Sequence, residues 1–236
     1  MMWKIPIALG MTGVIFGMMF LGRHSLLWES PQEQIVCCFS QESSAQYQPF
    51  PIVLEDQLVI ESLGGYEGPF LEDGTYEEVS DVVAVKVHNQ GFNPIKNTYF
   101  TLKTDQGIYT FRGSTILSDQ TCVLLELSRQ PYRGEIAAQC TGTVILEDKD
   151  NLMISGVSVE ESGEDAVRVT NATGYDLDNI CLCYKTYFAQ TDTLMGGITY
   201  EIEIKEIPSG ESKSLKLPFY VIGYSKIIAI YPADIK

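Results

Sequence analysis

The hydrophobic pattern divides the chain into an uncharged first stretch and a long remainder of short alternating segments. Residues 5–21 contain no charged side chain, and basic residues bound the stretch on both sides. A helix rises about 1.5 Å per residue, so the stretch extended to Leu27 crosses a bilayer core about 30 Å thick. Trp3 and Trp28 stand at its two ends, where indole rings favour the headgroup level. We therefore expect residues 1–28 to form a single transmembrane helix.

A cleaved signal peptide is the alternative interpretation of this segment. Residues 22–28 have no small-x-small cleavage pattern, and Arg23 lies just past the apolar run. The pattern therefore favours an uncleaved anchor, with the acidic, strand-rich remainder outside the cytoplasm. Residues 29–56 are rich in Gln, Ser and Glu and contain several prolines, which is typical of a polar tether.

From residue 57 onward the pattern is typical of an all-β protein. Short runs of β-branched and aromatic residues alternate with polar ones, and Gly, Asn, Asp or Pro interrupts them about every 8–12 residues. Past residue 30, helical periodicity never persists for three turns. Strands are expected to begin near Leu58, Val82, Asn97, Gly107, Thr121, Glu135, Leu152, Ala166, Asn179, Ile198, Ser212 and Lys226.

The first six of these segments and the last six are copies of one another. Residues 84–89 (Ala-Val-Lys-Val-His-Asn) align with residues 166–171 (Ala-Val-Arg-Val-Thr-Asn), and the same offset of 82 pairs Asn97 with Asn179. A repeat of this length indicates domain duplication, because solenoid repeats are shorter.

Alternation along a strand predicts which side chains point into the core. The inward positions are expected to be Val85, Val87, Phe100 and Leu102, and in the second copy Val167, Val169, Leu182 and Tyr184. The outward positions between them are Lys86 and His88, matched by Arg168 and Thr170. The asparagines that end the first repeated strand can satisfy free backbone groups at a corner between sheets.

The pattern Val-x-Asn-x5-[Ile/Leu]-x-Asn occurs at residues 87–97 and 169–179, and Pro-Ser-Gly-Glu-Ser follows the second occurrence at residues 208–212. It resembles the immunoglobulin-like β-sandwich modules of the CARDB and FxLYD type, which occur, often in tandem, in bacterial surface and membrane-anchored proteins. The resemblance covers about residues 81–127 and 165–217 and brings no active site with it. Together with the repeat, it leads us to expect two such domains, at residues 57–148 and 149–236. The first copy departs from the pattern with Leu-Ser-Asp-Gln at residues 117–120.

Composition narrows the class of function. The net charge of −15, from 31 acidic and 16 basic side chains, argues against binding of nucleic acid, which requires clustered Lys and Arg. Only His24 and His88 are present, so no Ser-His-Asp, Cys-His or His-rich metal arrangement can be assembled, and no cofactor is expected. Acidic residues near 147–150 leave calcium as an alternative to a solvated surface, although their spacing matches no calcium loop.

The cysteines leave several alternatives open. Cys122 and Cys140 flank a predicted hairpin turn near residues 131–134, so they could form a disulfide or remain two free thiols. Cys181 and Cys183 fall on outward positions, where they could react or bind a soft metal. Inert thiols covered by a loop or the other domain are the favoured interpretation.

Aromatic side chains in the first copy are the candidate partner-binding residues. Tyr66, Phe70, Tyr76 and Phe92 crowd predicted loops and edges, where they either contact a partner or close the ends of a sandwich. We expect a non-catalytic interaction or scaffold protein of the cell envelope, of undetermined oligomeric state. The alternative is a module that binds cell-wall glycan or another polymer. Exposed coplanar aromatics would favour glycan, whereas an exposed apolar edge or loop tip would favour a protein partner.

Overall fold

The computed structural model describes residues 47–147, 152–163, 165–188 and 191–233. Within these ranges the chain consists of strands, turns and loops and contains no helix, so the all-β prediction is confirmed. The described part therefore holds no helix long and apolar enough to span a membrane. The predicted anchor at residues 1–28 and the predicted domain boundary at residues 148–151 lie outside the described residues.

The strands fall into a first half, residues 47–147, and a second half, residues 152–233. Those of the first half are β1 (Gln48–Pro49), β2 (Ile52–Leu54), β3 (Leu58–Pro69), β4 (Glu78–Asn89), β5 (Ile95–Lys103), β6 (Ile108–Ile116), β7 (Thr121–Leu125) and β8 (Ala137–Leu146). Those of the second half are β9 (Val157–Glu161), β10 (Ala166–Asn171), β11 (Leu177–Phe188), β12 (Thr193–Ile207), β13 (Ser212–Lys216) and β14 (Ser225–Pro232).

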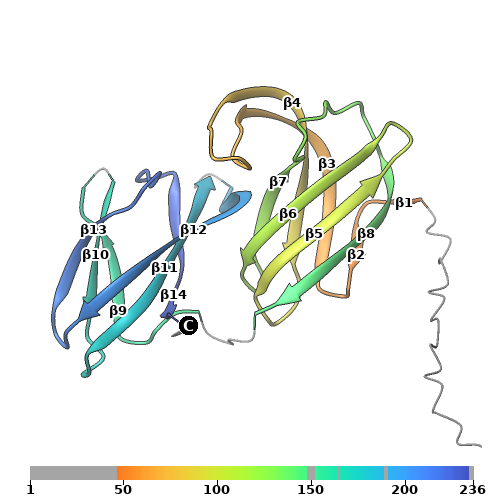
Figure 1. Ribbon diagram of the computed structural model, residues 1–236. Coiled ribbons are helices and arrows are strands. Elements are labelled where there is room, and N and C mark those ends of the chain that lie inside the picture. Colours follow the sequence, from red (N-terminus) through yellow and green to blue (C-terminus); the bar gives the residue numbers. More distant parts are fainter. Residues whose placement is uncertain (1–46, 148–151, 164, 189–190, 234–236) are drawn as a thin grey trace, which may run out of the picture. The chain divides into compact units, whose positions relative to one another are not determined.

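The described strands form three sheets (Figure 1). One has four strands in the order β1-β8-β5-β6, and one has three in the order β13-β10-β9. The largest has seven strands in the order β14-β11-β12-β7-β4-β3-β2, so it draws strands from both halves of the chain. Each half thus contributes to two sheets, and a hydrophobic core fills the space between them.

The core positions agree with the predicted alternation. All eight side chains predicted to point inward are buried, with exposed fractions of 0 or 1%. Those of β4 and β5 belong to the core of the first half, and those of β10 and β11 to the core of the second half. The outward prediction also holds, because none of Lys86, His88, Arg168 and Thr170 is buried.

Strand pairing follows the same register in the two halves. Val85 lies opposite Leu124, and its copy Val167 lies opposite Leu215. Phe100 lies opposite Phe111, and its copy Leu182 lies opposite Ile202. The strand order also corresponds, since β8-β5-β6 in the first half has the counterpart β14-β11-β12 in the second.

A buried asparagine closes the corner after the first repeated strand in each half. The Nδ2 atom of Asn89 donates to the carbonyls of Asn93 and Ile116, both at 3.0 Å. In the second half, Nδ2 of Asn171 donates to the carbonyls of Tyr175 and Ile207, both at 2.8 Å. These bonds satisfy carbonyl groups where the chain leaves one sheet for the other.

Strand β12 joins the two halves. It pairs with β11 over most of its length, while Leu194 and Met195 at its start pair in parallel with Cys122 and Val123 of β7. We call this contact the junction. The sequence predicted that this strand begins near Ile198, and the earlier residues of β12 are the ones that reach the first half.

The predicted hairpin between Cys122 and Cys140 is corrected by the structure. Strand β7 lies in the seven-stranded sheet and β8 in the four-stranded sheet, so the two strands do not pair, and both thiols are free. Between them the chain crosses from one sheet to the other. The buried carboxylate of Glu126 holds the start of this crossing by accepting the backbone N–H groups of Ser128 at 2.7 Å and Gln130 at 2.9 Å.

Two other boundaries differ from the sequence prediction. Strands β1 and β2 lie within residues 29–56, the expected tether, because Ile52 and Leu54 bury their side chains and β2 pairs with β3. In the second half, Leu152 is buried as a core residue, but the strand expected near it begins only at Val157.

Candidate functional site

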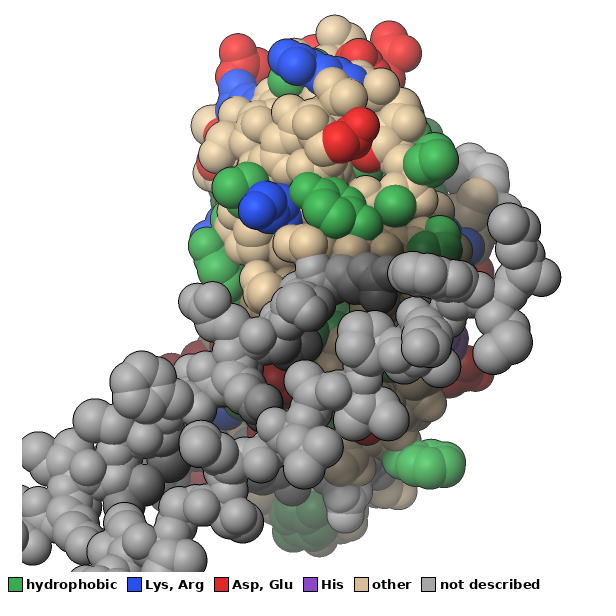
Figure 2. All heavy atoms as spheres, turned by 90° about the vertical axis from the view of Figure 1, so that its right-hand side faces the viewer, with side chains coloured by type: hydrophobic (Ala, Val, Ile, Leu, Met, Phe, Trp, Pro, Cys, Tyr) green, Lys and Arg blue, Asp and Glu red, His purple; other side chains and the backbone are tan. Residues whose placement is uncertain are grey.

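The connection between β13 and β14 exposes a cluster of apolar side chains. The apolar loop, residues 218–224, carries no charge, and lysines 216 and 226 lie beyond its two ends. Tyr220 is buried, but four other large side chains are exposed, with fractions of 59% for Phe219, 52% for Val221, 38% for Ile222 and 58% for Tyr224. Figure 2 shows that hydrophobic side chains also reach the surface at separate places on one side of the molecule. The apolar loop is distinct in that four of them follow one another along a short stretch of chain.

Hydrogen bonds to neighbouring strands hold the backbone of the apolar loop. The Tyr184 hydroxyl donates to the carbonyl of Pro218 at 2.7 Å, and the backbone N–H of Tyr187 donates to the carbonyl of Tyr224 at 2.8 Å. The backbone N–H of Val221 donates to Oγ of Ser225 at 3.0 Å. Burial raises the pKa of Tyr184 to about 12, so its hydroxyl stays protonated and remains a donor at neutral pH. The exposed side chains are therefore presented on a braced backbone.

Aromatic side chains support one end of the apolar loop. The ring of Phe219 lies 5.8 Å from that of Tyr76 and 5.5 Å from that of Tyr200, measured between centroids. The hydroxyls of Tyr76 and Tyr200 form a hydrogen bond of 2.7 Å with each other. Because Tyr76 belongs to the first half and Phe219 to the second, this cluster bridges the two halves.

The four aromatic residues predicted from the sequence lie in different settings. Tyr76 contacts the apolar loop as described. Phe70 is 1% exposed, and the Arg129 guanidinium lies 4.4 Å from its ring centroid, so it does not form part of the surface. Tyr66 is half-buried and donates to the carbonyl of Pro69 at 3.0 Å. Phe92 is 98% exposed.

The apolar loop was not among the candidate sites expected from the sequence. It lies between the strands expected to begin near Ser212 and Lys226. The absence of any charge in this stretch of an acidic chain was the available signal. Pro218 and Gly223 interrupt the alternation that would otherwise have marked a strand, and they place the apolar residues in a loop.

A second arrangement lies at the junction, where Glu72 is buried between strands. Its Oε1 atom accepts the backbone N–H of Gly197 in β12 at 2.8 Å and that of Leu125 in β7 at 3.1 Å. Arg112 donates to the carbonyl of Glu72, and its Nε lies 4.0 Å from Oε2 of the carboxylate. That Oε2 atom has no hydrogen-bond partner within the described residues, and the side chain is 1% exposed. Glu72 therefore links the two halves through backbone groups.

Lys185 and Cys122 are buried in the same region. The Nζ atom of Lys185 donates to the carbonyls of Gly196 at 3.1 Å and Ile198 at 3.3 Å, and Sγ of Cys122 lies 3.4 Å from the carbonyl of Gly196. Burial raises the pKa of Cys122 to about 11, so this thiol is protonated and weakly nucleophilic at neutral pH. Burial likewise raises the pKa of Glu72 and lowers that of Lys185, which disfavours both charges.

Cys181 and Cys183 are also buried, whereas Cys140 is half-buried. Cys181 is 8% and Cys183 2% exposed, although alternation placed them on the outward side of their strand. Burial is the first cause that raises the pKa of each, to about 12 for Cys181 and about 11 for Cys183. Over the part of the chain that the structure describes, no three His, Cys, Asp or Glu side chains group as metal ligands.

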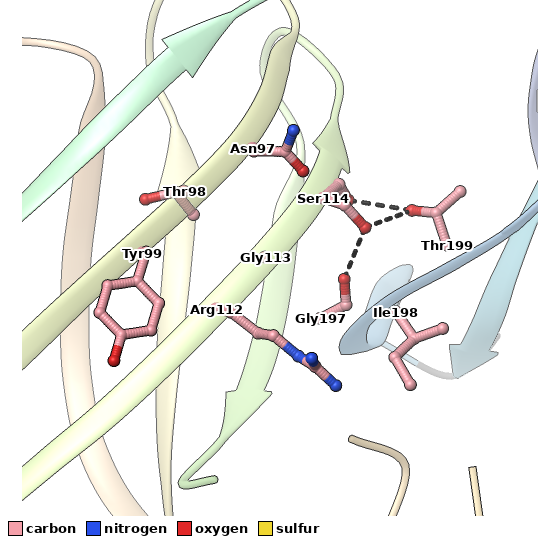
Figure 3. Close-up of a pocket in the computed structure, with 9 residues that line it drawn as sticks. All are labelled: Asn97, Thr98, Tyr99, Arg112, Gly113, Ser114, Gly197, Ile198 and Thr199. Atoms are coloured by element: carbon pink, nitrogen blue, oxygen red, sulfur yellow. Dashed lines mark hydrogen bonds between the residues drawn. The ribbon is translucent and has the colours of Figure 1, made fainter. Parts of the chain in front are cut away.

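A hollow of about 430 Å³ opens beside the junction (Figure 3). It is lined by Asn97, Thr98, Tyr99, Arg112, Gly113, Ser114, Gly197, Ile198 and Thr199. Oγ of Ser114 donates to the carbonyl of Gly197 at 2.7 Å and bonds Oγ1 of Thr199 at 2.9 Å. Figure 3 shows the side chains of Tyr99 and Arg112 projecting from neighbouring strands at this hollow.

Comparison with known proteins gives no match to a protein-family model and no similar sequence among curated proteins.

Proposed function

We propose that this chain is a non-catalytic interaction protein that presents its apolar loop to a partner protein. The observation that carries the proposal is the exposure of Phe219, Val221, Ile222 and Tyr224 on one braced loop. Aromatic and aliphatic side chains at the centre of an interface supply most of its binding energy once water is excluded. A loop that is already ordered loses less conformational entropy on binding, which favours affinity.

The predicted anchor and tether would place this interaction at the cell membrane. A transmembrane helix at residues 1–28 would hold the described part at the outer surface of the cell membrane, where the partner would be another envelope protein. The repeated pairing register and the two corner asparagines support two tandem immunoglobulin-like domains, as the resemblance to CARDB and FxLYD modules implies. In such a protein the second domain would carry the apolar loop, and the first would brace it through Tyr76.

Site-specific photo-crosslinking in cells tests the proposal. A photoreactive amino acid is placed at Val221 of the full-length chain and, as the matched control, at Phe92, which is more exposed but lies on another loop. We expect one envelope protein to crosslink from position 221 and not from position 92, and the purified protein to reproduce that contact. Crosslinking of the same proteins from both positions, or of none from position 221, would contradict the proposal.

The alternative function, binding of a glycan or another polymer, depends on a different surface. The outer side of the four-stranded sheet has a composition that favours glycan binding. This surface is separate from the apolar loop.

A further inference from the structure

The outer side of β8, β5 and β6 carries no acidic side chain. Strand pairing arranges its residues in rows across the three strands, each row taking one residue from each strand in that order. The rows are Ile145–Asn97–Ser114, Thr143–Tyr99–Arg112, Thr141–Thr101–Thr110 and Gln139–Lys103–Ile108. We call these residues the hydroxyl face, because Ser and Thr are its commonest members and Lys103 and Arg112 its only charges.

This composition is unusual for the chain. The protein carries a net charge of −15, so a solvated sheet surface without Asp or Glu is less acidic than the chain as a whole. The corresponding strands of the second half provide an internal comparison. There, Glu203 and Glu201 of β12 lie opposite Cys181 and Cys183 of β11, at the positions that Arg112 and Thr110 take in the first half.

Tyr99 and Arg112 form the most specific part of the hydroxyl face. They lie directly opposite each other on β5 and β6, and both line the hollow beside the junction. The Tyr99 side chain is 54% exposed. Arg112 is held by its bond to the Glu72 carbonyl while half of its side chain stays exposed, so its remaining N–H groups can meet a ligand.

The carboxylates that border the hydroxyl face, Glu72 and Glu55 among them, do not belong to its rows. Glu72 is buried beside Arg112, where burial disfavours its charge. Glu55 lies at the edge of β8, where Oε2 accepts the backbone N–H of Val144 at 3.0 Å. The positive charge of Lys103 and Arg112 therefore has no acidic partner within the rows themselves.

We propose that the hydroxyl face binds an acidic polysaccharide, with a sugar ring on Tyr99 and its carboxylate on Arg112. An exposed tyrosine ring offers an apolar surface to the C–H face of a sugar, and its hydroxyl remains available to polar groups. The guanidinium fork matches a carboxylate in two parallel hydrogen bonds. The surrounding hydroxyl and amide side chains can exchange hydrogen bonds with sugar hydroxyls, and the absence of Asp and Glu removes charge repulsion.

Binding of polygalacturonate, an acidic polysaccharide, is compared with that of neutral dextran of similar length, using the full-length protein in detergent and calorimetry. We expect polygalacturonate to bind, binding to weaken with added salt, and dextran to bind at least roughly tenfold more weakly, since a charge-assisted pair contributes about 1.5–3 kcal/mol. Tyr99→Ala and Thr141→Glu, both at exposed positions, are each expected to reduce binding of polygalacturonate by roughly tenfold or more. Phe92→Ala is the matched control and should bind as the unaltered protein does.

Three outcomes would overturn the proposal. They are absence of polygalacturonate binding, equal binding of dextran, and unchanged binding by both Tyr99→Ala and Thr141→Glu. Thermal melting of each variant shows whether it is folded, and using two independent positions keeps the test decisive if one variant unfolds.

Discussion

At the scale of single residues, buried polar side chains fix the places where the backbone changes direction or crosses between halves. Asn89 and Asn171 are both 0% exposed, and each donates to backbone carbonyls at the corner between sheets. The buried carboxylate of Glu72 has a similar role, because it accepts backbone N–H groups from two strands. A buried polar group that loses its partner costs more than an average hydrogen bond contributes, so these residues dominate the local energetics.

Replacement of either corner asparagine by alanine is expected to lower the unfolding free energy by about 1–3 kcal/mol, because buried carbonyls lose their donor. The midpoint of denaturant unfolding measures this change for Asn89→Ala and Asn171→Ala. Asn97→Ala is the matched control, because Asn97 is exposed. Equal midpoints for Asn171→Ala and the control would show that the corner bonds do not stabilise the fold.

The substitution Glu72→Gln is expected to change how stability depends on pH. Burial raises the folded-state pKa of Glu72 above its ordinary value of 4.5, so the folded protein binds this proton more tightly than the unfolded chain does. The stability that this proton supplies is present at low pH and is lost as pH rises through the folded-state pKa. Glutamine keeps the acceptor for Gly197 and Leu125 but does not titrate.

The unaltered protein should therefore lose stability relative to Glu72→Gln as pH rises above 4.5 and through the raised folded-state pKa. Denaturant midpoints at several pH values measure the difference. The titratable groups that interact with Glu72 are Arg112, Tyr200 and the buried Lys185 and Cys122, which both forms share. A difference that stays constant over this range would contradict the assignment of a raised pKa.

At the scale of the elements, β12 has two roles. Its later residues pair with β11, and its first residues reach β7 and the loop that carries Glu72. Gly197 permits this approach, since a Cβ atom there would lie 2.1 Å from the carbonyl oxygen of Arg112 and 2.9 Å from Oε2 of Glu72. The close contact of these segments therefore depends on a residue without a side chain.

Gly197→Ala is expected to separate β12 from its neighbours and to lower stability by about 1–3 kcal/mol, as overpacking does in a close-packed interior. Hydrogen exchange at the amides of Leu125 and Gly197 should become faster. Gly64→Ala is the matched control, because nothing lies within 4 Å of the added Cβ. If both variants exchange and unfold alike, the close approach at Gly197 is not what holds the junction.

Alternation was sufficient to predict much of each strand. Val85 and Val87, and the second-half residues Val167 and Val169, are all at 0% exposure as expected, because a strand with one buried face fixes the side of every second residue. Ala166, Ser212, Leu58 and Thr121 are the first residues of their strands, as predicted. The buried face of a strand and its first residue depend on neighbouring residues in the chain, so they can be predicted from one sequence.

Features that depend on distant parts of the chain were not predictable in the same way. Nothing near Cys122 indicates that the chain then crosses to the other sheet, so the expected hairpin with Cys140 was wrong. Cys181 and Cys183 occupy outward positions by alternation and are buried, which agrees with the favoured interpretation of covered thiols, although the sequence did not indicate which residues cover them. The role of Glu72 was hidden among neighbouring acidic residues, because its partners Leu125 and Gly197 are far along the chain.

At the scale of the whole molecule, we propose the apolar loop as a surface for a partner protein. The two halves share one sheet, and Tyr76 of the first half supports Phe219 of the second, so the loop is presented by the folded unit as a whole. Four exposed apolar side chains on a braced backbone are costly to leave in water, and a partner that covers them would recover that cost.

The most direct test compares proteins captured in cells by three forms of the full-length chain after crosslinking, quantified by mass spectrometry. One form is unaltered, one carries Phe219→Ser, Val221→Ser, Ile222→Ser and Tyr224→Ser, and a matched control carries Phe92→Ser and Ile136→Ser at other exposed apolar sites. We expect an envelope protein that the unaltered and control forms capture equally and that the loop variant captures at least roughly tenfold less, because the variant has lost its interface anchors. Equal capture of that protein by all three forms would contradict the claim.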